Sequence, residues 1–493
     1  MYKEKTRDTY NVIQYISETW NNLTINFIDS YQNYYNSKVS NNGNITPTIM
    51  ISEKENIQKI IDRVNSSFDQ KHKMKVLCIN QDFNKINSNH LLYLPYPYIS
   101  PGGRFNEMYG WDSFFIIIGL LKMKRLNSAL NMINNLFYQV EHYGKVLNAN
   151  RAYYIGRSQP PLLSQSAIEI YKYNKCKVFL ENSLKYILKD YEYWSHGGHF
   201  VSEIGLSRYY SSSSSKLPDT EEGYYESVIK KYKEMSDLNE DISKYYDKNS
   251  NTLTSNFYQA DRAVRESGFD LSNKFGLFGA DIQDYIPVSL NSLLFLTEKN
   301  LAYIFEILDQ EPEKSFWENR ASHRKTLINK YCWNEDDGLY YDYNFIKKEQ
   351  RKYTYATTIY PLYVGISSAN QANKVINNIG LLEHNGGIMA SPYQTGMQWD
   401  SPIGWAPDQY FTVCSLQKYG YDIDAKRIAQ KYLSMITNDF KKNNYIYEKY
   451  NMESCSSNVD DIIKYGYKEN AIGFGWTNAV YLFFIDKYSD YQL

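Results

Sequence analysis

Amphipathic helical segments recur along this chain and constrain its fold more than any other feature. In the segment 128–144, Leu130, Ile133, Leu136 and Val140 follow one another at steps of three and four residues. This spacing places them on one face of an α-helix. Similar patterns run through five further segments: 166–194, 290–308, 323–333, 408–420 and 425–440. Strand-like alternation is rare by comparison, so the chain is predicted to be all-α.

The connections between these helices carry most of the polar and aromatic chemistry. The segment PGGRFNEMYGWDSFF, 101–115, combines turn glycines, a cation, acids and aromatic residues. The indole of Trp111 can cover the apolar face of a sugar ring, while Arg104, Glu107 and Asp112 can form charge-assisted hydrogen bonds with its hydroxyls. This mixture favours a sugar pocket.

A second segment of the same chemistry, QWDSPIGWAP at 398–407, follows almost three hundred residues later. Either segment alone is compatible with an aromatic loop buried for packing, but the pair favours one binding site to which both contribute. A closed ring of helical hairpins would bring alternate loops to one end, where distant residues can meet. Helical repeats stacked openly would not close such a pocket.

Charge and cysteine content narrow the classes of partner. Lys and Arg number 54 against 55 Asp and Glu, so no basic field exists to hold a nucleic acid. Five scattered cysteines without metal-ligand spacing are predicted to be reduced core thiols. His196 and His199 lie three apart, but the glycines between them predict a loop. Phosphate-loop and dinucleotide fingerprints are missing from the sequence, and we expect no metal and no cofactor.

The N-terminal sequence lacks an apolar run followed by a small-residue cleavage site, so we expect a cytoplasmic protein. The longest apolar run, 114–121, is far shorter than the roughly 20 residues that cross a bilayer, and it predicts a buried helix instead. Residues 1–95 are predicted to form a helical region packed on a main domain of residues 96–493. The serine run 211–215 indicates a mobile loop, and the adjoining residues can reach the pocket.

Hydrolysis of a glycosidic bond requires one acid that protonates the leaving oxygen and one carboxylate that attacks or activates water. Asp270 follows Gly268 and Phe269, a close approach with an aromatic neighbour that would desolvate the acid and raise its pKa. It is therefore the candidate general acid. Glu448, flanked by Tyr447 and Lys449, is the candidate base. Composition alone would not single out either residue among 55 acids.

The segments PGGRFNEMYGWD and QWDSPIGWAP resemble the two signature patterns of the trehalase family, inverting hydrolases of α,α-trehalose. The resemblance covers the chain from about residue 95 and continues through the following segments: 148–161, 266–270, 331–343, 448–450 and 473–480. It implies an (α/α)6 barrel with the helical N-terminal region packed on it.

The resemblance also implies roles for individual residues. Asp270 would be the general acid, and Glu448 would be the base that activates water for a single displacement with inversion. The residues it implies for sugar binding are Arg104, Trp111, Asp112, Asn148, Arg157, Gln159 and Trp399, with Gly268 allowing close backbone approach. The two carboxyl groups of an inverting site lie about 6.5 to 9.5 Å apart. The implied substrate is the disaccharide trehalose, cleaved to two glucose molecules.

The chain departs from the family pattern at several positions. Leu217 and Asp219 stand in an element that is usually Arg-Pro-Glu and contacts the second glucose, Phe269 replaces a Trp, and Lys274 replaces an Arg. The segment 461–476 also differs from a glycine-rich, Glu-containing flap. Two alternatives therefore remain: an inverting hydrolase of another small α-glucoside, and a catalytically silent sugar-binding protein.

Overall fold

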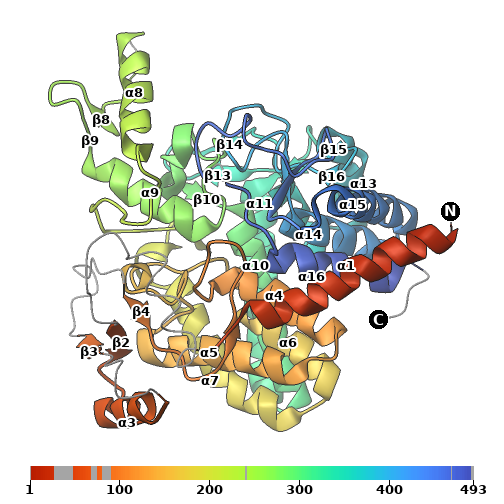
Figure 1. Ribbon diagram of the computed structural model, residues 1–493. Helices are drawn as coiled ribbons and strands as arrows, with labels where there is room; N and C mark the ends of the chain where they lie inside the picture. Colours follow the sequence, from red (N-terminus) through yellow and green to blue (C-terminus); the bar gives the residue numbers. More distant parts are fainter. Residues whose placement is uncertain are drawn as a thin grey trace.

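The computed structural model describes residues 2–26, 48–67, 75–79, 90–238, 241–467 and 469–489. Helices dominate this part of the chain (Figure 1). They are α1 (Tyr2–Asn22), α3 (Ile57–Ser67), α4 (Gly110–Lys122), α5 (Leu126–Tyr143), α6 (Leu163–Asn174), α7 (Lys177–Ser195), α8 (Tyr224–Asp237), α9 (Ser255–Ser267), α10 (Val288–Ile307), α11 (Glu311–Cys332), α12 (Tyr360–Val364), α13 (Ala369–Asn377), α14 (Ala406–Lys418), α15 (Asp422–Asn443) and α16 (Gly475–Tyr488). None of them has the length and apolar character needed to cross a bilayer.

The strands are short and form sheets of two or three strands. They are β1 (Thr24–Ile25), β2 (Thr48–Ser52), β3 (Lys75–Ile79), β4 (Leu91–Leu92), β5 (Tyr98–Ile99), β6 (Phe200–Val201), β7 (Leu206–Ser207), β8 (Tyr246–Asp247), β9 (Thr252–Leu253), β10 (Tyr285–Ile286), β11 (Trp333–Asn334), β12 (Leu339–Tyr340), β13 (Asp342–Asn344), β14 (Glu349–Arg351), β15 (Glu383–His384), β16 (Gly387–Ile388), β17 (Ile403–Trp405) and β18 (Lys449–Asn451). Most of the pairs are antiparallel, including β17 with β18.

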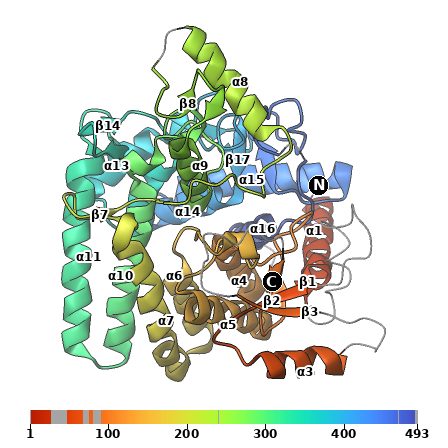
Figure 2. The same cartoon turned by 90° about the vertical axis from the view of Figure 1, so that its left-hand side faces the viewer.

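Alternate helices form a closed inner ring. Each of α4, α6, α10, α12, α14 and α16 packs against the next, and α16 returns to α4. An outer layer covers the ring, with α5 against α4 and α6, α7 against α6 and α10, α11 against α10, and α15 against α14 and α16. The fold is an (α/α)6 barrel, which confirms the predicted class. The hairpin β8–β9 and α8 stand out from it (Figures 1 and 2).

Sequence explains which helices line the ring. In α4 every residue from 110 to 121 is buried, because an inner helix is covered on all sides. Such a helix is expected to be largely apolar all round, and in α4 the exceptions are Asp112 and Ser113 in the first turn. This confirms the buried helix predicted at 114–121. In α5 the buried residues lie mainly along one face, as expected of an outer helix. Gly119 allows α4 and α16 to approach closely, since a Cβ there would lie 2.7 Å from the Cβ of Ala479.

One predicted helical segment, 166–194, is two helices, α6 and α7. The chain turns at Lys175, whose φ of 55° is left-handed. The side chain of Asn174 accepts a hydrogen bond from the backbone N–H of Cys176 at 3.0 Å. Asn stabilises turns through bonds of this kind, so the break is local in origin.

The N-terminal region contains helices, as expected, and also a sheet that was not predicted. Helix α1 packs on α15 and α16, and its Trp20 is fully buried. Strand β2 pairs in parallel with both β3 and β4. Periodicity does not separate a five-residue strand from a short buried helix, which is why this sheet was missed. Residues 27–47, 68–74 and 80–89 lie outside the described part of the chain.

Candidate active site

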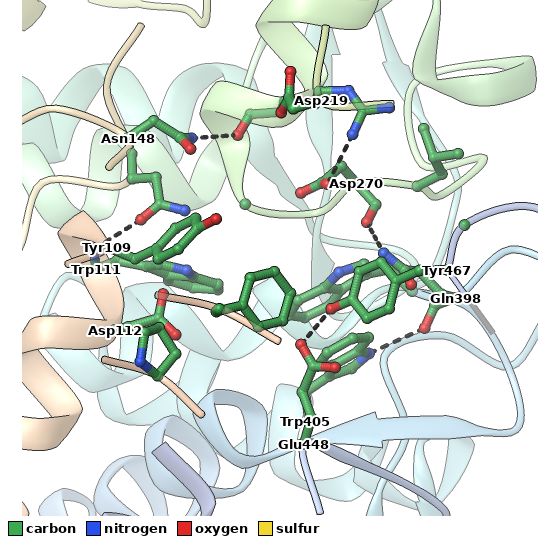
Figure 3. A pocket seen from close by; sticks show the side chains of 18 of the residues that line it. Tyr109, Trp111, Asp112, Asn148, Asp219, Asp270, Gln398, Trp405, Glu448 and Tyr467 are labelled. Atoms are coloured by element: carbon green, nitrogen blue, oxygen red, sulfur yellow. Dashed lines mark hydrogen bonds and ion pairs between the residues drawn. The ribbon is translucent and has the colours of Figure 1, made fainter. Parts of the chain in front are cut away.

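One pocket collects the ten residues to which the family resemblance gave catalytic or binding roles. They are Arg104, Trp111, Asp112, Asn148, Arg157, Gln159, Gly268, Asp270, Trp399 and Glu448. Figure 3 labels five of them: Trp111, Asp112, Asn148, Asp270 and Glu448. Most of these residues lie in the loops that precede the inner helices α4, α6, α14 and α16. The inner helices of such a ring all run in the same direction. The loops therefore meet at one end, as expected, and the segments 101–115 and 398–407 converge there.

Four indoles form an apolar wall of the pocket. Trp399 stacks on Trp405 with ring centroids 4.0 Å apart and planes 6° apart. Trp476 stands edge-on to Trp405 at 5.7 Å, and Trp111 lies 6.0 Å from Trp399. All four are at most 4% exposed. A wall of this kind suits the apolar face of a sugar ring.

The turn after α9 presents Asp270 to the pocket. Gly268 ends the helix with a φ of 77°, and a Cβ there would lie 3.0 Å from the indole of Trp111. Both features require glycine, in line with the predicted close approach. The backbone carbonyl of Asp270 accepts a hydrogen bond from the side-chain amide of Gln398. The turn is thereby tied to the loop that carries the indole wall.

The carboxyl group of Asp270 has a raised pKa. Its side chain is 29% exposed, and Arg265 Nη1 lies 3.5 Å from its Oδ2. Burial raises the pKa to about 6, although Arg265 and Arg157 act to lower it. Asp270 therefore holds a proton in mildly acidic solution, which is what a general acid requires.

Glu448 lies below Asp270 in the view of Figure 3, next to strand β18. Its backbone N–H donates to the carbonyl of Ala471 at 2.9 Å, and its carbonyl accepts the indole N–H of Trp476 at 3.0 Å. The side chain is 2% exposed. The hydroxyl of Tyr467 donates to Oε1, and Lys449 Nζ lies 3.6 Å from Oε2. Burial raises the pKa of Glu448, while Lys449 and Tyr467 act in the opposite direction.

Asp112 is the third acid in the pocket. It lies in the first turn of α4 and is 4% exposed. Burial and the nearby charge of Glu448 raise its pKa well above the usual value. A protonated Asp112 can both donate to and accept from a sugar hydroxyl.

The segment after the serine run reaches the pocket, as expected. Asp219 accepts a hydrogen bond from Arg157 Nη2 at 2.5 Å, and Glu221 pairs with Arg104 at 2.6 Å. Burial opposes the charge on Asp219, but Arg157 and Arg265 outweigh it and hold the pKa below its usual value. One end of the pocket is therefore lined by charged side chains of both signs.

Two predicted binding residues also support the pocket wall. The side-chain oxygen of Gln159 accepts the backbone N–H of Trp111 at 3.0 Å. The amide of Asn148 donates to the carbonyls of Ser158 and Arg265, each at 3.2 Å. Part of the hydrogen-bonding capacity of these side chains thus fixes the loops before α4 and α6.

Glu107 is not a pocket residue, contrary to the expectation for the segment 101–115. It is fully buried, and Arg151 Nε donates to its Oε1 at 2.5 Å. Its charge is used to join two loops, and its side chain does not line the pocket.

Asp400 and His199 are also structural. Asp400 accepts hydrogen bonds from five groups: the hydroxyls of Ser272, Tyr353, Ser391 and Thr395 and the backbone N–H of Asn273. His199 Nε2 lies 2.9 Å from Glu266 Oε2. Within the residues that the structure describes, no group of three or more His, Cys, Asp or Glu side chains is placed to hold a metal ion.

Several lining residues were not predicted. Gln398, Trp405 and Trp476 lie inside the quoted motifs, so those motifs held a signal for them. Arg265 directly precedes the segment 266–270, and Tyr467 lies within 461–476, but neither residue was given a role there. Their places depend on how segments distant in sequence pack together.

A ring of helical hairpins around a pocket lined by carboxyl groups and an indole wall defines the class as an (α/α)6 barrel. The trehalase family model matches residues 13–489. The chain belongs to the trehalase family.

Known proteins agree with this membership. The chain is 34% identical over 429 residues to a cytosolic neutral trehalase of Kluyveromyces lactis, covering 79% of this chain and 56% of that protein. It is 32% identical over 474 residues to a cytosolic neutral trehalase of Saccharomyces cerevisiae, covering 88% and 62%. The chain thus spans little more than half the length of these relatives.

Solved structures share the fold. Neutral trehalase Nth1 from Saccharomyces cerevisiae superposes with a TM-score of 0.81 at 28% identity, covering 97% of this chain and 94% of that chain. A mannosylglycerate hydrolase from Thermus thermophilus gives a TM-score of 0.55 at 13% identity, covering 78% and 95%. The second likeness concerns the fold alone.

Proposed function

We propose that this protein hydrolyses α,α-trehalose to two glucose molecules by a single displacement with inversion. The observation that carries the proposal is that Asp270 and Glu448 open into one indole-lined pocket and that their surroundings differ. Family membership and the trehalase names of the relatives support the same substrate.

In the proposed reaction Asp270 gives its proton to the glycosidic oxygen as the bond from that oxygen to the anomeric carbon breaks. Glu448 takes a proton from the water that attacks the same carbon from the opposite face. The raised pKa of Asp270 supports the acid role. Lys449 and Tyr467 favour ionised Glu448 and so support the base role. The carboxyl groups of such a pair are expected about 6.5 to 9.5 Å apart.

The predicted sugar-binding residues keep their proposed roles around this pair. Trp111 and Trp399 would cover the ring of the reacting glucosyl unit, and Asp112 would bond its hydroxyls. We assign the second glucose to the charged end with Arg157 and Asp219. No cofactor takes part in the proposed steps.

The main alternative to this proposal is a substrate with a different leaving group. Leu217, at the position that differs from the family element, is buried at 3% exposure, whereas Asp219 enters the pocket between two arginines. The glucosyl unit of a different small α-glucoside would contact the same residues around Asp270 and Glu448. A catalytically silent protein would bind sugar without turnover.

Glucose release from the purified chain tests these possibilities, with trehalose and a panel of other α-glucosides as substrates. Asp270→Asn and Glu448→Gln should each lower kcat by about 10²–10⁴-fold, the usual contribution of acid–base groups. Calorimetry should show that both variants still bind trehalose. Release from another α-glucoside but not from trehalose would contradict the substrate assignment, and unchanged turnover in either variant would refute that residue's role.

We also propose a cytoplasmic location, which the cytosolic names of the relatives support. The division into residues 1–95 and a catalytic domain of residues 96–493 stays a proposal. Val12, Ile16 and Trp20 of α1 belong to the main core, so the N-terminal region is expected to unfold together with the barrel. Cell fractionation and limited proteolysis would test these two points.

A further inference from the structure

Tyr467 contacts one oxygen of the proposed base directly. Its side chain is partly buried, and its hydroxyl donates a hydrogen bond to Oε1 of Glu448 (Figure 3). A phenol bonded to a carboxylate stabilises the ionised form and restricts its rotation. One oxygen of Glu448 is therefore occupied before any sugar binds.

The other oxygen of Glu448 is in a different position. Among the described residues, no donor forms a hydrogen bond with Oε2, although that atom is buried. Lys449 Nζ lies 3.6 Å away, which is close enough for charge attraction but too long for a hydrogen bond. The carboxylate thus has one oxygen engaged and one open.

Two cations hold the ring of Tyr467 in place. Lys449 Nζ lies 3.7 Å from the ring centroid, and the guanidinium carbon of Arg104 lies 4.5 Å from it. Both distances are in the range of cation–π attraction. Arg104 is held in turn by Glu221 at 2.6 Å. The hydroxyl is therefore aimed by contacts from three separate segments of the chain.

The backbone before Tyr467 is fixed as well. The N–H groups of Lys464 and Tyr465 both donate to the carbonyl of Gly396, at 2.8 and 3.1 Å. Gly466 has a φ of 115°, and a Cβ there would lie 2.9 Å from the side chain of Gln398. The turn at Gly466 packs this segment against the loop that contains Gln398. The side chain of Gln398 also bonds the carbonyl of Asp270.

We propose that Tyr467 is a positioning residue for the base: it occupies Oε1 of Glu448 and so assigns Oε2 as the oxygen that accepts the proton of the attacking water. The inference rests on the proposed function, because it takes Glu448 as the base. In the step, a water O–H bond breaks and an Oε2–H bond forms. The water oxygen bonds to the anomeric carbon, and the departing oxygen receives the proton of Asp270.

The charges around Glu448 determine the direction in which loss of the Tyr467 hydroxyl shifts the pKa of Glu448. Burial disfavours its ionised form, whereas Lys449, the Tyr467 hydroxyl and Arg104 favour it. The charge of Glu448 in turn raises the pKa of Asp112. The charged and titratable groups that face Glu448 come from several elements. These groups are Arg104 before α4, Asp112 in α4, Asp270 after α9, Lys449 in β18 and Tyr467 itself. Loss of the phenol hydroxyl should therefore raise the pKa of Glu448.

The test compares Tyr467→Phe with Tyr465→Phe in the full chain. Tyr465 lies on the same segment and packs edge-on against Phe278 at 5.0 Å, so it is a matched loss of one hydroxyl. We expect Tyr467→Phe to lower kcat/KM for trehalose about tenfold, as for loss of a bond to a charged group. The acidic limb of its pH profile should move to higher pH while the alkaline limb stays. Tyr465→Phe should keep both limbs.

An acidic limb that does not move in Tyr467→Phe would overturn the inference, because a purely structural role lowers the rate evenly at all pH values. Calorimetry with a basic iminosugar separates this failure from failure of the proposed function. Wild-type protein that binds the iminosugar but releases no glucose contradicts the proposed function. In that case a shift in the pH dependence of binding by Tyr467→Phe still supports the pairing with Glu448, and an unshifted profile overturns it.

Discussion

Asp270 and Glu448 share a pocket but have different surroundings. Arg265 lies beside Asp270, yet burial still raises the pKa of that acid to about 6. Glu448 is more deeply buried and has both Lys449 and Tyr467 to favour its ionised form. In the proposed mechanism, environment and not residue type divides the roles between the two acids.

The pH dependence of kcat/KM should follow from the acid. A general acid must be protonated in the free enzyme, so activity is present below the pKa of Asp270 and is lost as the pH rises through it. With a pKa of about 6, we expect kcat/KM to fall about tenfold per pH unit on the alkaline side. Initial rates between pH 4 and 9 would measure this limb.

Circular dichroism over the same range is the control, because unfolding would also remove activity. A folded protein whose kcat/KM stays level up to pH 8 would contradict the assignment of Asp270 as the acid.

The sequence correctly predicted that Asp270, Glu448 and their neighbours share a pocket, because they lie in recognisable motifs. The catalytic roles of the two acids stay predictions. The sequence did not predict Arg265, which stands five residues before Asp270 and meets it only because the chain turns back at Gly268. It placed Glu107 in the pocket, although that acid pairs with Arg151 in the interior. Which of several adjacent polar side chains faces a cavity depends on packing between loops.

At the scale of elements, the contact between α4 and α16 closes the ring. It is close because Gly119 has no side chain, and its position lies against Ala479 of α16 and Trp20 of α1. Three helices meet at this point, which joins the start, the first quarter and the end of the chain.

Gly119→Val should therefore separate these helices. Overpacking a tight core contact costs about 1–3 kcal/mol, so we expect a lower midpoint of thermal unfolding, measured by calorimetry. Gly156→Ala is the control, since a Cβ at Gly156 meets no atom of the described chain within 4 Å. A Gly119→Val variant with the same midpoint of thermal unfolding as the wild type would show that this contact does not limit stability.

Helix positions were the most predictable elements. Long apolar periodicity correctly predicted α5, α10, α14 and α15, since tertiary packing and local pattern agree there. The break between α6 and α7 was missed because it rests on one left-handed residue. The parallel sheet of β2, β3 and β4 was missed because its strands are too short for periodicity to identify.

At the scale of the whole molecule, the ring explains how segments almost three hundred residues apart form one site. The loops before α4 and α14 meet because inner helices of a closed ring share one direction. The same geometry brings Asp270, after α9, and Glu448, before β18, to a common pocket. The central claim is that these two acids act on one glucosyl unit from opposite faces.

The anomeric form of the released glucose tests that claim most directly. Proton NMR of the first minutes of trehalose hydrolysis, before mutarotation, resolves α- from β-glucose. Inversion at one anomeric carbon predicts equal amounts of the two anomers, because the attacked unit becomes β and the leaving unit stays α. Release of α-glucose alone would mean retention and would contradict the account.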